Sequence, residues 1–143
     1  MNPGETVMMI STKGRYALRI MIDLAQHQNE GNIPLKDVAM RQNTSLKYLE
    51  AIARTLSKSG LIVAYHGKNG GYRLEQSPAD ISTAAILRAA EGDLKPVACA
   101  GATTGNCAQS NECLTYPLWQ KLDDRIYDYL ESVSLEDVMT GNV

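Results

Sequence analysis

All three cysteines of this 143-residue chain lie in one short segment. Cys99, Cys107 and Cys113 have seven and then five residues between them, in a stretch rich in Gly, Asn, Ser and Thr that has no helical or strand period (residues 92–113). Three thiols so close together in a chain without a secretory signal indicate metal or redox chemistry rather than structural disulfides. Thiolates suit iron and zinc, so the spacing predicts a metal centre. Unmetallated thiols that sense oxidants and cysteines without function are the alternatives.

The sequence offers no obvious fourth ligand for such a centre. Tyr116 stands three residues after Cys113, at the start of the next expected helix, and is the candidate to consider, although phenolate is an uncommon cluster ligand. His27 ends the expected first helix and His66 lies in an expected hairpin, so neither is a natural partner for the cysteines.

A second group of polar residues lies on two expected helices in residues 34–59. The first helix begins after Pro34 and ends at Gln42. A connector of Asn43, Thr44 and Ser45 follows, and it leads to a second helix that is capped by Ser45 and ends at Gly60. One face of the second helix is apolar and the other is polar. This is the pattern of a helix-turn-helix, which places its second helix in the DNA major groove. An ordinary pair of helices is the alternative.

A β-hairpin is expected directly after these helices. The strands are residues 61–65 and 71–74, and the glycine-rich residues between them supply the positive φ angles that a tight turn requires. The tip carries His66 and Lys68 and little bulk, so its backbone could approach a phosphate or a minor groove closely. The hairpin is therefore interpreted as the wing of a winged helix-turn-helix.

The charge distribution agrees with a DNA-binding first half. Residues 1–76 hold ten Lys and Arg against six Asp and Glu, a net charge of +4, while the remaining residues have a net charge of −6. Local charge steers a polyanion toward a patch, so an overall charge of −2 does not exclude nucleic acid. A basic face with no partner is the alternative.

The remaining elements complete a mainly α fold with one small β-hairpin. Residues 1–8 are expected to form a flexible N-terminal extension, residues 9–91 the winged helix-turn-helix domain, residues 92–113 the cysteine-bearing loop, and residues 114–143 a long helix with a C-terminal turn. The domain begins with a helix from Ser11 or Thr12 to about Gln28 and closes with a helix over residues 83–90. The first helix has an apolar stripe that includes Ile20, Met21 and Leu24, and its charged residues, Asp23 among them, are expected to lie mostly outside this stripe.

The long C-terminal helix is predicted to form a dimer. Apolar residues recur every three or four positions from Leu114 to Val133, with acidic residues largely on the other side. Such a stripe beyond a closed domain requires a partner, and helix-turn-helix proteins commonly read two-fold sites as dimers. Packing of this helix on its own domain is the alternative. Ser134 is expected to cap a last turn.

Several classes of protein do not fit the sequence. No run is long enough for a membrane span, so a cytoplasmic protein is expected. The chain contains no paired-carboxylate, nucleophile–histidine or phosphate-loop constellation, so an enzyme is not expected. A small iron–sulfur electron carrier or metalloenzyme could use the cysteines, but the wing would then have no explanation.

The sequence resembles the bacterial winged helix-turn-helix regulators of the Rrf family, which includes the IscR, NsrR and CymR types, and most of all the iron–sulfur cluster regulators. The resemblance covers nearly everything from Met9 to Met139. The motifs that carry it, besides the cysteine loop, are STKGRYALR (11–19), SLKYLE (45–50), LSKSGLI (56–62), GKNGGYRL (67–74), CLTYPLW (113–119) and SLEDVM (134–139).

The resemblance implies a homodimeric transcription factor that binds a two-fold operator in double-stranded DNA. The residues expected to contact DNA are Lys13, Ser45, Lys47, Tyr48, Glu50, Arg54, His66 and Lys68. Among them, Glu50 is able to accept a hydrogen bond from a cytosine amine. The resemblance also implies an iron–sulfur cluster held by Cys99, Cys107 and Cys113. A 2Fe–2S cluster is favoured and a 4Fe–4S cluster is the other possibility, and purified protein can lack the cluster.

This chain departs from the family pattern at four places. The first cysteine gap is seven residues where the best-known member has five, and Tyr116 occupies the place of that member's histidine ligand. Arg15 stands where the NsrR branch uses an aspartate ligand, and His66 stands where the wing usually carries arginine. A cluster-free regulator of the CymR kind, controlled by a protein partner or by thiol oxidation, is the alternative function.

Overall fold

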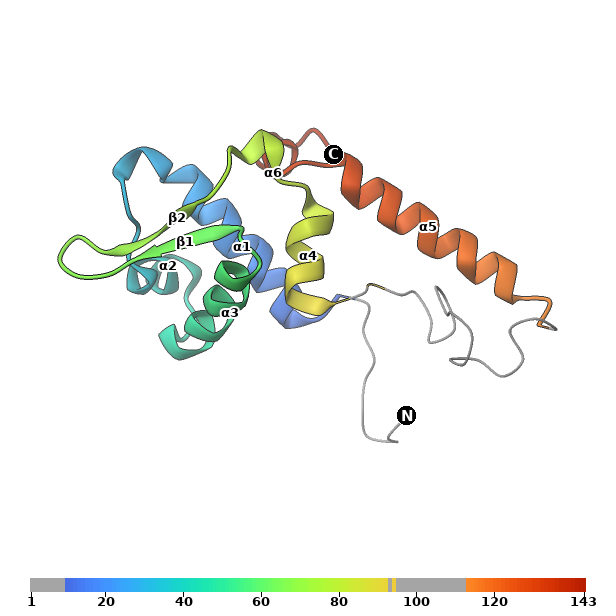
Figure 1. The fold of residues 1–143 in the computed structure, drawn as a ribbon, viewed down its shortest axis with the longest axis horizontal. Coiled ribbons are helices and arrows are strands. Elements are labelled where there is room, and N and C mark those ends of the chain that lie inside the picture. Colours follow the sequence, from blue (N-terminus) through green and yellow to red (C-terminus); the bar gives the residue numbers. More distant parts are fainter. Residues whose placement is uncertain (1–9, 93, 95–112) are drawn as a thin grey trace.

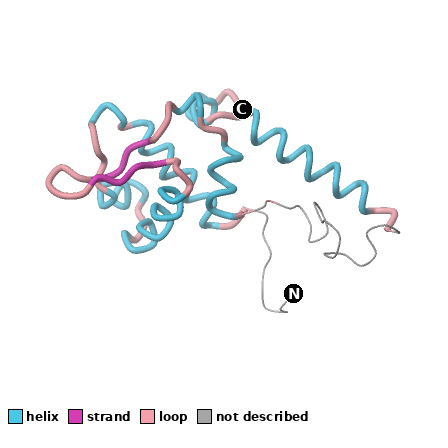
Figure 2. Tube along the Cα trace, viewed as in Figure 1, coloured by secondary structure: helices cyan, strands magenta, loops and turns pink. Residues whose placement is uncertain are grey.

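A computed structural model describes residues 10–92, 94 and 113–143 of the chain. The expectations for residues 1–8 and for most of the cysteine segment fall outside these residues. The elements follow one another as α1 (Thr12–Gln26), η1 (Gln28–Glu30), α2 (Leu35–Gln42), α3 (Leu46–Lys58), β1 (Ile62–Tyr65), β2 (Gly71–Leu74), η2 (Pro78–Asp80), α4 (Thr83–Glu91), α5 (Tyr116–Ser132) and α6 (Leu135–Thr140). The mainly helical fold with one small hairpin is confirmed (Figures 1 and 2).

Four helices begin at a serine whose hydroxyl oxygen accepts a hydrogen bond from the backbone N–H three residues later. These N-cap residues are Ser11, Ser45, Ser82 and Ser134. Such a bond satisfies one of the amides that a helix leaves without a partner in its first turn. At Ser134 the bond is reciprocal, because the carboxylate of Asp137 accepts from the N–H of Ser134 at 3.0 Å. The side chains at the starts of α1, α3, α4 and α6 therefore define where these helices begin.

The hydrophobic core is built around α1, which packs against α2, α3 and α4. Its fully buried members include Ile20, Met21 and Leu24 of α1, with Leu49 and Ile52 of α3 packed in the same core. The apolar stripes expected on α1 and α3 are the faces that the fold buries.

One residue of α1 was placed wrongly by its polarity. The expected pattern put Asp23 outside the apolar stripe, but its side chain is only 2% exposed. Helical periodicity does place this residue beside Ile20 and Leu24, on the inner face. A carboxylate can occupy that position because Arg41 of α2 donates two hydrogen bonds to it.

A third segment of the chain pairs with the hairpin. β1 and β2 pair antiparallel from Ile62 opposite Leu74 to Tyr65 opposite Gly71. Beside β2, Ile33 exchanges two backbone hydrogen bonds of 2.8 Å with Tyr72. This close approach requires glycine at position 71, since a Cβ atom there would lie 2.5 Å from the backbone of Ile33. The base of the hairpin is thus fixed to the segment before α2.

Helix α5 extends away from the domain on the side opposite the hairpin loop (Figure 1). None of its 17 residues is buried. It joins the domain at its C-terminal end, where the Thr83 hydroxyl donates to the carbonyl of Leu130 at 2.7 Å. The helix begins at Tyr116 instead of Leu114, since Pro117 belongs in a first turn and Thr115 takes the N-cap position.

Candidate nucleic-acid interface and cysteine site

The outer face of α3 presents a polar stripe to solvent. Lys47, Glu50 and Arg54 are exposed and lie three and four residues apart, so they share one side of the helix. The opposite side is buried in the core through Leu49, Ile52, Ala53 and Leu56. The core therefore holds α3 rigidly while its charged side remains free to contact a partner.

Two other residues expected on the recognition helix have structural contacts of their own. The Ser45 hydroxyl oxygen accepts a hydrogen bond from the N–H of Tyr48 at 3.1 Å. The ring of Tyr48 is half-buried and meets the ring of Tyr16 edge-on, with 5.6 Å between the ring centroids. Tyr48 therefore packs α3 against α1, which is a structural role in addition to the DNA contact predicted for it.

The contact between Tyr48 and Tyr16 brings α1 beside α3. Lys13 is exposed in the first turn of α1, one helical turn before Tyr16. The guanidinium of Arg19 lies over the Tyr16 ring, 5.0 Å from its centroid. Arg19 was not among the residues predicted from the sequence, although its spacing of three residues from Tyr16 places both on one helix face.

The tip of the hairpin exposes both residues predicted there, His66 and Lys68. The turn closes through a hydrogen bond of 3.0 Å from the N–H of Gly70 to the carbonyl of Gly67. Asn69 takes a left-handed conformation with φ of 66°. Figure 1 shows that this loop projects beyond the helices on the side of α2. The wing thus presents a cationic side chain on a narrow backbone.

The wing is fixed by side chains whose role the sequence alone does not indicate. The amide of Asn32 donates to the carbonyl of Asn69 at 3.1 Å, and the Asn32 side-chain oxygen accepts from Arg73 at 2.8 Å. The Arg73 guanidinium also lies 5.1 Å from the centroid of the Tyr65 ring. No sequence pattern could reveal Asn32, because its partners lie 37 and 41 residues away.

Of the three cysteines, only Cys113 belongs to the described residues, and Cys99 and Cys107 lie outside them. The sulfur of Cys113 lies 3.0 Å from the hydroxyl oxygen of Thr115. Hydrogen bonding to the Thr115 side chain, and then to the backbone N–H groups of Thr115 and Tyr116, lowers the pKa of the Cys113 thiol. These contacts favour the thiolate, which is the form that binds metals and reacts with oxidants.

Tyr116, the candidate fourth ligand, begins α5, and its N–H donates to the carbonyl of Cys113 at 3.2 Å. Among the residues that the structure describes, no three His, Cys, Asp or Glu side chains gather closely enough to hold a metal ion. This leaves the predicted ligand set untested, since two of its cysteines lie in residues 95–112.

Glu91 fixes the point from which the cysteine segment leaves the domain. It is the last residue of α4, and one of its carboxylate oxygens accepts from the N–H of Gly14 at 2.8 Å and from the N–H of Ser11 at 3.1 Å. The Ser11 hydroxyl donates to the same oxygen. The start of α1 and the start of the cysteine segment are therefore joined by one side chain.

No described helix is both long and apolar enough to span a bilayer.

Comparisons with known proteins give one consistent result. Residues 10–141 match the Rrf2 family model, whose description is iron-dependent transcriptional regulator. The HTH-type transcriptional regulator IscR of Aliivibrio salmonicida is 38% identical over 135 residues, which cover 94% of this chain and 79% of that protein.

Solved structures of two kinds of regulator are similar to this fold. The global cysteine regulator CymR of B. subtilis is 35% identical, with a TM-score of 0.75, and the match covers 94% of this chain and 98% of that one. IscR of T. potens is 36% identical, with a TM-score of 0.74 and coverage of 98% and 90%. The comparisons thus include one protein named for cysteine regulation and others named IscR.

Proposed function

Because the chain belongs to the Rrf2 family of transcriptional regulators, which are DNA-binding proteins and not enzymes, we propose that it is a homodimer that reads a two-fold operator. In this proposal α3 enters the major groove and the wing enters the neighbouring minor groove. The three cysteines hold an iron–sulfur cluster that sets the affinity for DNA. A protein with this role acts where the chromosome is, so we place it in the cytoplasm.

The exposed stripe of α3 is the observation that carries the DNA-binding part of the proposal. Lys47 and Arg54 can contact phosphates or guanine edges, and Glu50 between them can accept from the N4 amine of cytosine. Ser45 and Tyr48 support the first turn and bring α1, with Lys13, to the same side.

The geometry of the wing supports a contact in the minor groove. Lys68 is exposed at its tip, and Asn32 fixes the tip by bonding to Asn69. A fixed loop loses little conformational freedom on binding, which favours affinity. With His66 where the family usually has arginine, Lys68 supplies the permanent positive charge at this position.

Helix α5 supports the dimer. Leu118 and Leu122 are 60% and 40% exposed, and Tyr129 is 53% exposed. These side chains recur at helical spacing on an element with no buried residue, so a second α5 is the partner that a two-fold operator requires. The alternative, in which α5 packs along its own domain, does not fit this exposure.

The donor chemistry at the start of α5 fits an iron–sulfur cluster. The contacts of Cys113 favour its thiolate, and Cys99 and Cys107 would supply two further sulfur ligands. When bound, such a cluster supplies a centre that responds to iron supply and to oxidants. A 2Fe–2S cluster is preferred to a 4Fe–4S cluster, and the fourth ligand is left unassigned, with Tyr116 as a candidate.

The chain connectivity suggests how the cysteines could affect DNA binding. Residues 92–113 connect Glu91 of α4 to the start of α5, so the way in which their thiols are held can bias the position of α5 relative to the domain. A change in α5 alters the distance or tilt between the two recognition helices of a dimer. Such regulation requires that the bound state favours one dimer geometry over the other.

A cluster-free regulator is the second candidate, and two observations favour it. The fold is as similar to CymR as to IscR, and the contacts of Cys113 that favour a metal ligand also favour a thiol that oxidants or a partner protein can modify. Control by a protein partner belongs to this alternative.

Protein purified without oxygen distinguishes the two candidates. We expect iron and acid-labile sulfide, visible absorption, and operator binding that changes when Cys99, Cys107 and Cys113 are all replaced by alanine. Equal affinity and equal sequence preference in wild type and triple variant, both after anaerobic reconstitution, would remove the cluster from the mechanism. Absence of visible absorption together with thiol-dependent DNA binding would favour the cluster-free regulator.

A further inference from the structure

A charged side chain lies in the interface between α1 and α2. Asp23 is 2% exposed and sits on the face of α1 that also carries the core residues Ile20 and Leu24. Removing a carboxylate from water is costly unless it is paired and hydrogen-bonded. No buried side-chain nitrogen or oxygen in the described part of the chain lacks a partner, so Asp23 is fully accommodated.

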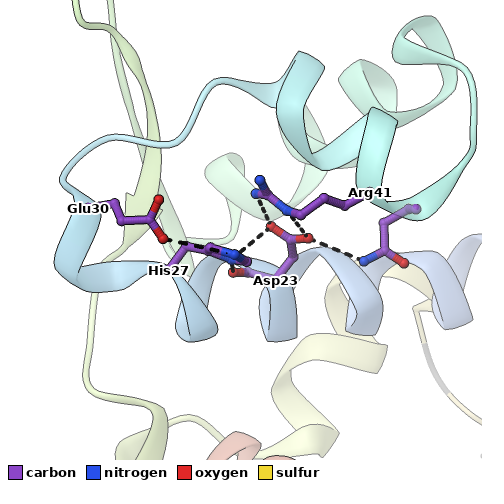
Figure 3. A network of polar contacts seen from close by, with 5 residues as sticks. Asp23, His27, Glu30 and Arg41 are labelled. Carbon is purple, nitrogen blue, oxygen red and sulfur yellow. Dashed lines mark hydrogen bonds and ion pairs between the residues drawn. The ribbon is translucent and has the colours of Figure 1, made fainter.

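The partners of Asp23 come mainly from the end of α2 (Figure 3). Arg41 donates from Nη2 to Oδ1 at 2.6 Å and from Nε to Oδ2 at 3.0 Å, and Gln42 donates from Nε2 to Oδ2 at 3.3 Å. The hydrogen bond to Asp23 raises the pKa of Arg41. On the other side of the carboxylate, Nδ1 of His27 lies 3.5 Å from Oδ1 of Asp23. Nε2 of the same ring lies 3.9 Å from a carboxylate oxygen of Glu30.

The pairing geometry is directional. A two-point contact between a guanidinium and a carboxylate fixes both the distance and the relative orientation of its two groups. The buried residues of α2 are Leu35, Val38 and Ala39, and contacts of this apolar kind are non-directional. The Asp23–Arg41 pair therefore restrains how the C-terminal end of α2 is turned relative to α1.

The position of this end matters because α3 follows it after a short, ordered turn. Arg41 and Gln42 are the last two residues of α2, and Asn43 then takes a left-handed conformation with φ and ψ of 51°. The N–H of Thr44 donates to the carbonyl of Ala39 at 3.0 Å, and Ser45 caps α3. Because this connection is short and held by hydrogen bonds, a rotation of the end of α2 moves the first turn of α3.

We propose that Asp23 is a positioning residue for operator recognition. By holding Arg41 and Gln42, it sets the angle at which α3 meets the duplex. The inference rests on the proposed DNA-reading role of α3. It assigns a role in recognition geometry to a pair whose carboxylate is buried and whose arginine side chain is 37% exposed. Replacing such a carboxylate and its partner by apolar residues of similar volume is often neutral for stability.

The test compares specific with non-specific DNA binding at one salt concentration. The specific probe is a duplex selected from a random library by the wild-type protein, and the non-specific probe is a scrambled duplex of equal composition. The main variant is Asp23→Leu/Arg41→Met, which replaces the pair by apolar side chains. The double variant keeps the net charge, because it removes one negative and one positive charge, but only the positive charge, on Arg41, belongs to an exposed side chain. The control is therefore Lys36→Met, which removes an exposed positive charge from the same helix.

We expect the double variant to lose about tenfold in its preference for the selected duplex, the equivalent of one base contact. Its affinity for the scrambled duplex should change no more than that of Lys36→Met. If the double variant does not fold, Arg41→Lys decides the question, because lysine keeps the charge and loses the two-point geometry. Arg41→Lys should then lose preference while keeping its affinity for the scrambled duplex.

Two results would overturn the proposal, and they differ. If wild type selects a duplex and the folded double variant, or Arg41→Lys in its place, binds it with unchanged preference, Asp23 has no positioning role. If wild type selects no duplex at all, the DNA-reading function fails, and the positioning role fails with it.

Discussion

Replacing Gly14 by alanine should destabilise the protein in one background and stabilise it in another. Gly14 is buried in the first turn of α1, and a Cβ atom there would lie 2.4 Å from Oε1 of Glu91 and 3.0 Å from its Cδ. The Glu91 side chain can rotate away, so the steric cost is small. The real cost is the loss of the hydrogen bonds that Glu91 accepts from Gly14 and Ser11.

The magnitude follows from two opposing contributions. Losing the bonds to a half-buried carboxylate at a helix start costs about 2 kcal/mol. Alanine in place of glycine within a helix contributes about 0.5–1 kcal/mol in the other direction. Gly14→Ala should therefore lower the free energy of unfolding by about 1 kcal/mol, or about 3 °C in melting temperature for a chain of this size.

The background variants make this reasoning refutable. In Glu91→Ala protein the clash is absent, so Gly14→Ala should now raise the free energy of unfolding by about 0.5–1 kcal/mol. In Glu91→Gln protein the side chain keeps its size, so Gly14→Ala should still destabilise. Urea unfolding followed by circular dichroism measures all six proteins. Equal destabilisation by Gly14→Ala in the wild-type and Glu91→Ala backgrounds would refute the contact.

Three further predictions concern the dimer, the wing and the last helix. Leu118→Asp combined with Leu122→Asp should give folded monomers by analytical ultracentrifugation, because both side chains are exposed on α5; a dimer of unchanged stability would contradict the proposed interface. Lys68→Ala should reduce the slope of log K against log salt by about 0.9 if Lys68 contacts one phosphate, and an unchanged slope would exclude that contact. A hydrogen bond from the Ser134 backbone lowers the pKa of Asp137 in the folded protein, so its contribution to stability is present above about pH 4 and lost as the pH falls further. Asp137→Asn should therefore show a smaller drop in melting temperature on acidification than wild type, and an equal drop would contradict this.

The local elements could be predicted because their signals lie within a few residues of one another. Ser45 caps α3 through Tyr48, three residues away, and the apolar stripe of α3 repeats at helical spacing. The glycines of the hairpin similarly indicate its turn from neighbouring residues alone. Short-range patterns therefore sufficed for the helix-turn-helix and the wing.

The residues that hold these elements together could not be predicted in the same way. Asp23 is hydrogen-bonded across 18 residues to Arg41, Asn32 across 41 to Arg73, and Glu91 across 80 to Ser11. Each is an ordinary polar residue in its own segment, and polarity alone suggests exposure. Only the packing of distant segments shows that these side chains fix the start of α1, the end of α2 and the wing.

Methylation of the selected duplex by dimethyl sulfate tests the central claim most directly, because the reagent reports the major groove at guanine N7 and the minor groove at adenine N3. With α3 and the wing bound in adjacent grooves, each half-site should show protected guanines beside protected adenines. Lys68→Ala should weaken only the adenine protection, and Glu50→Ala should not affect it. Full reactivity of the guanines in a saturated complex would contradict the account, because α3 would then not occupy the major groove.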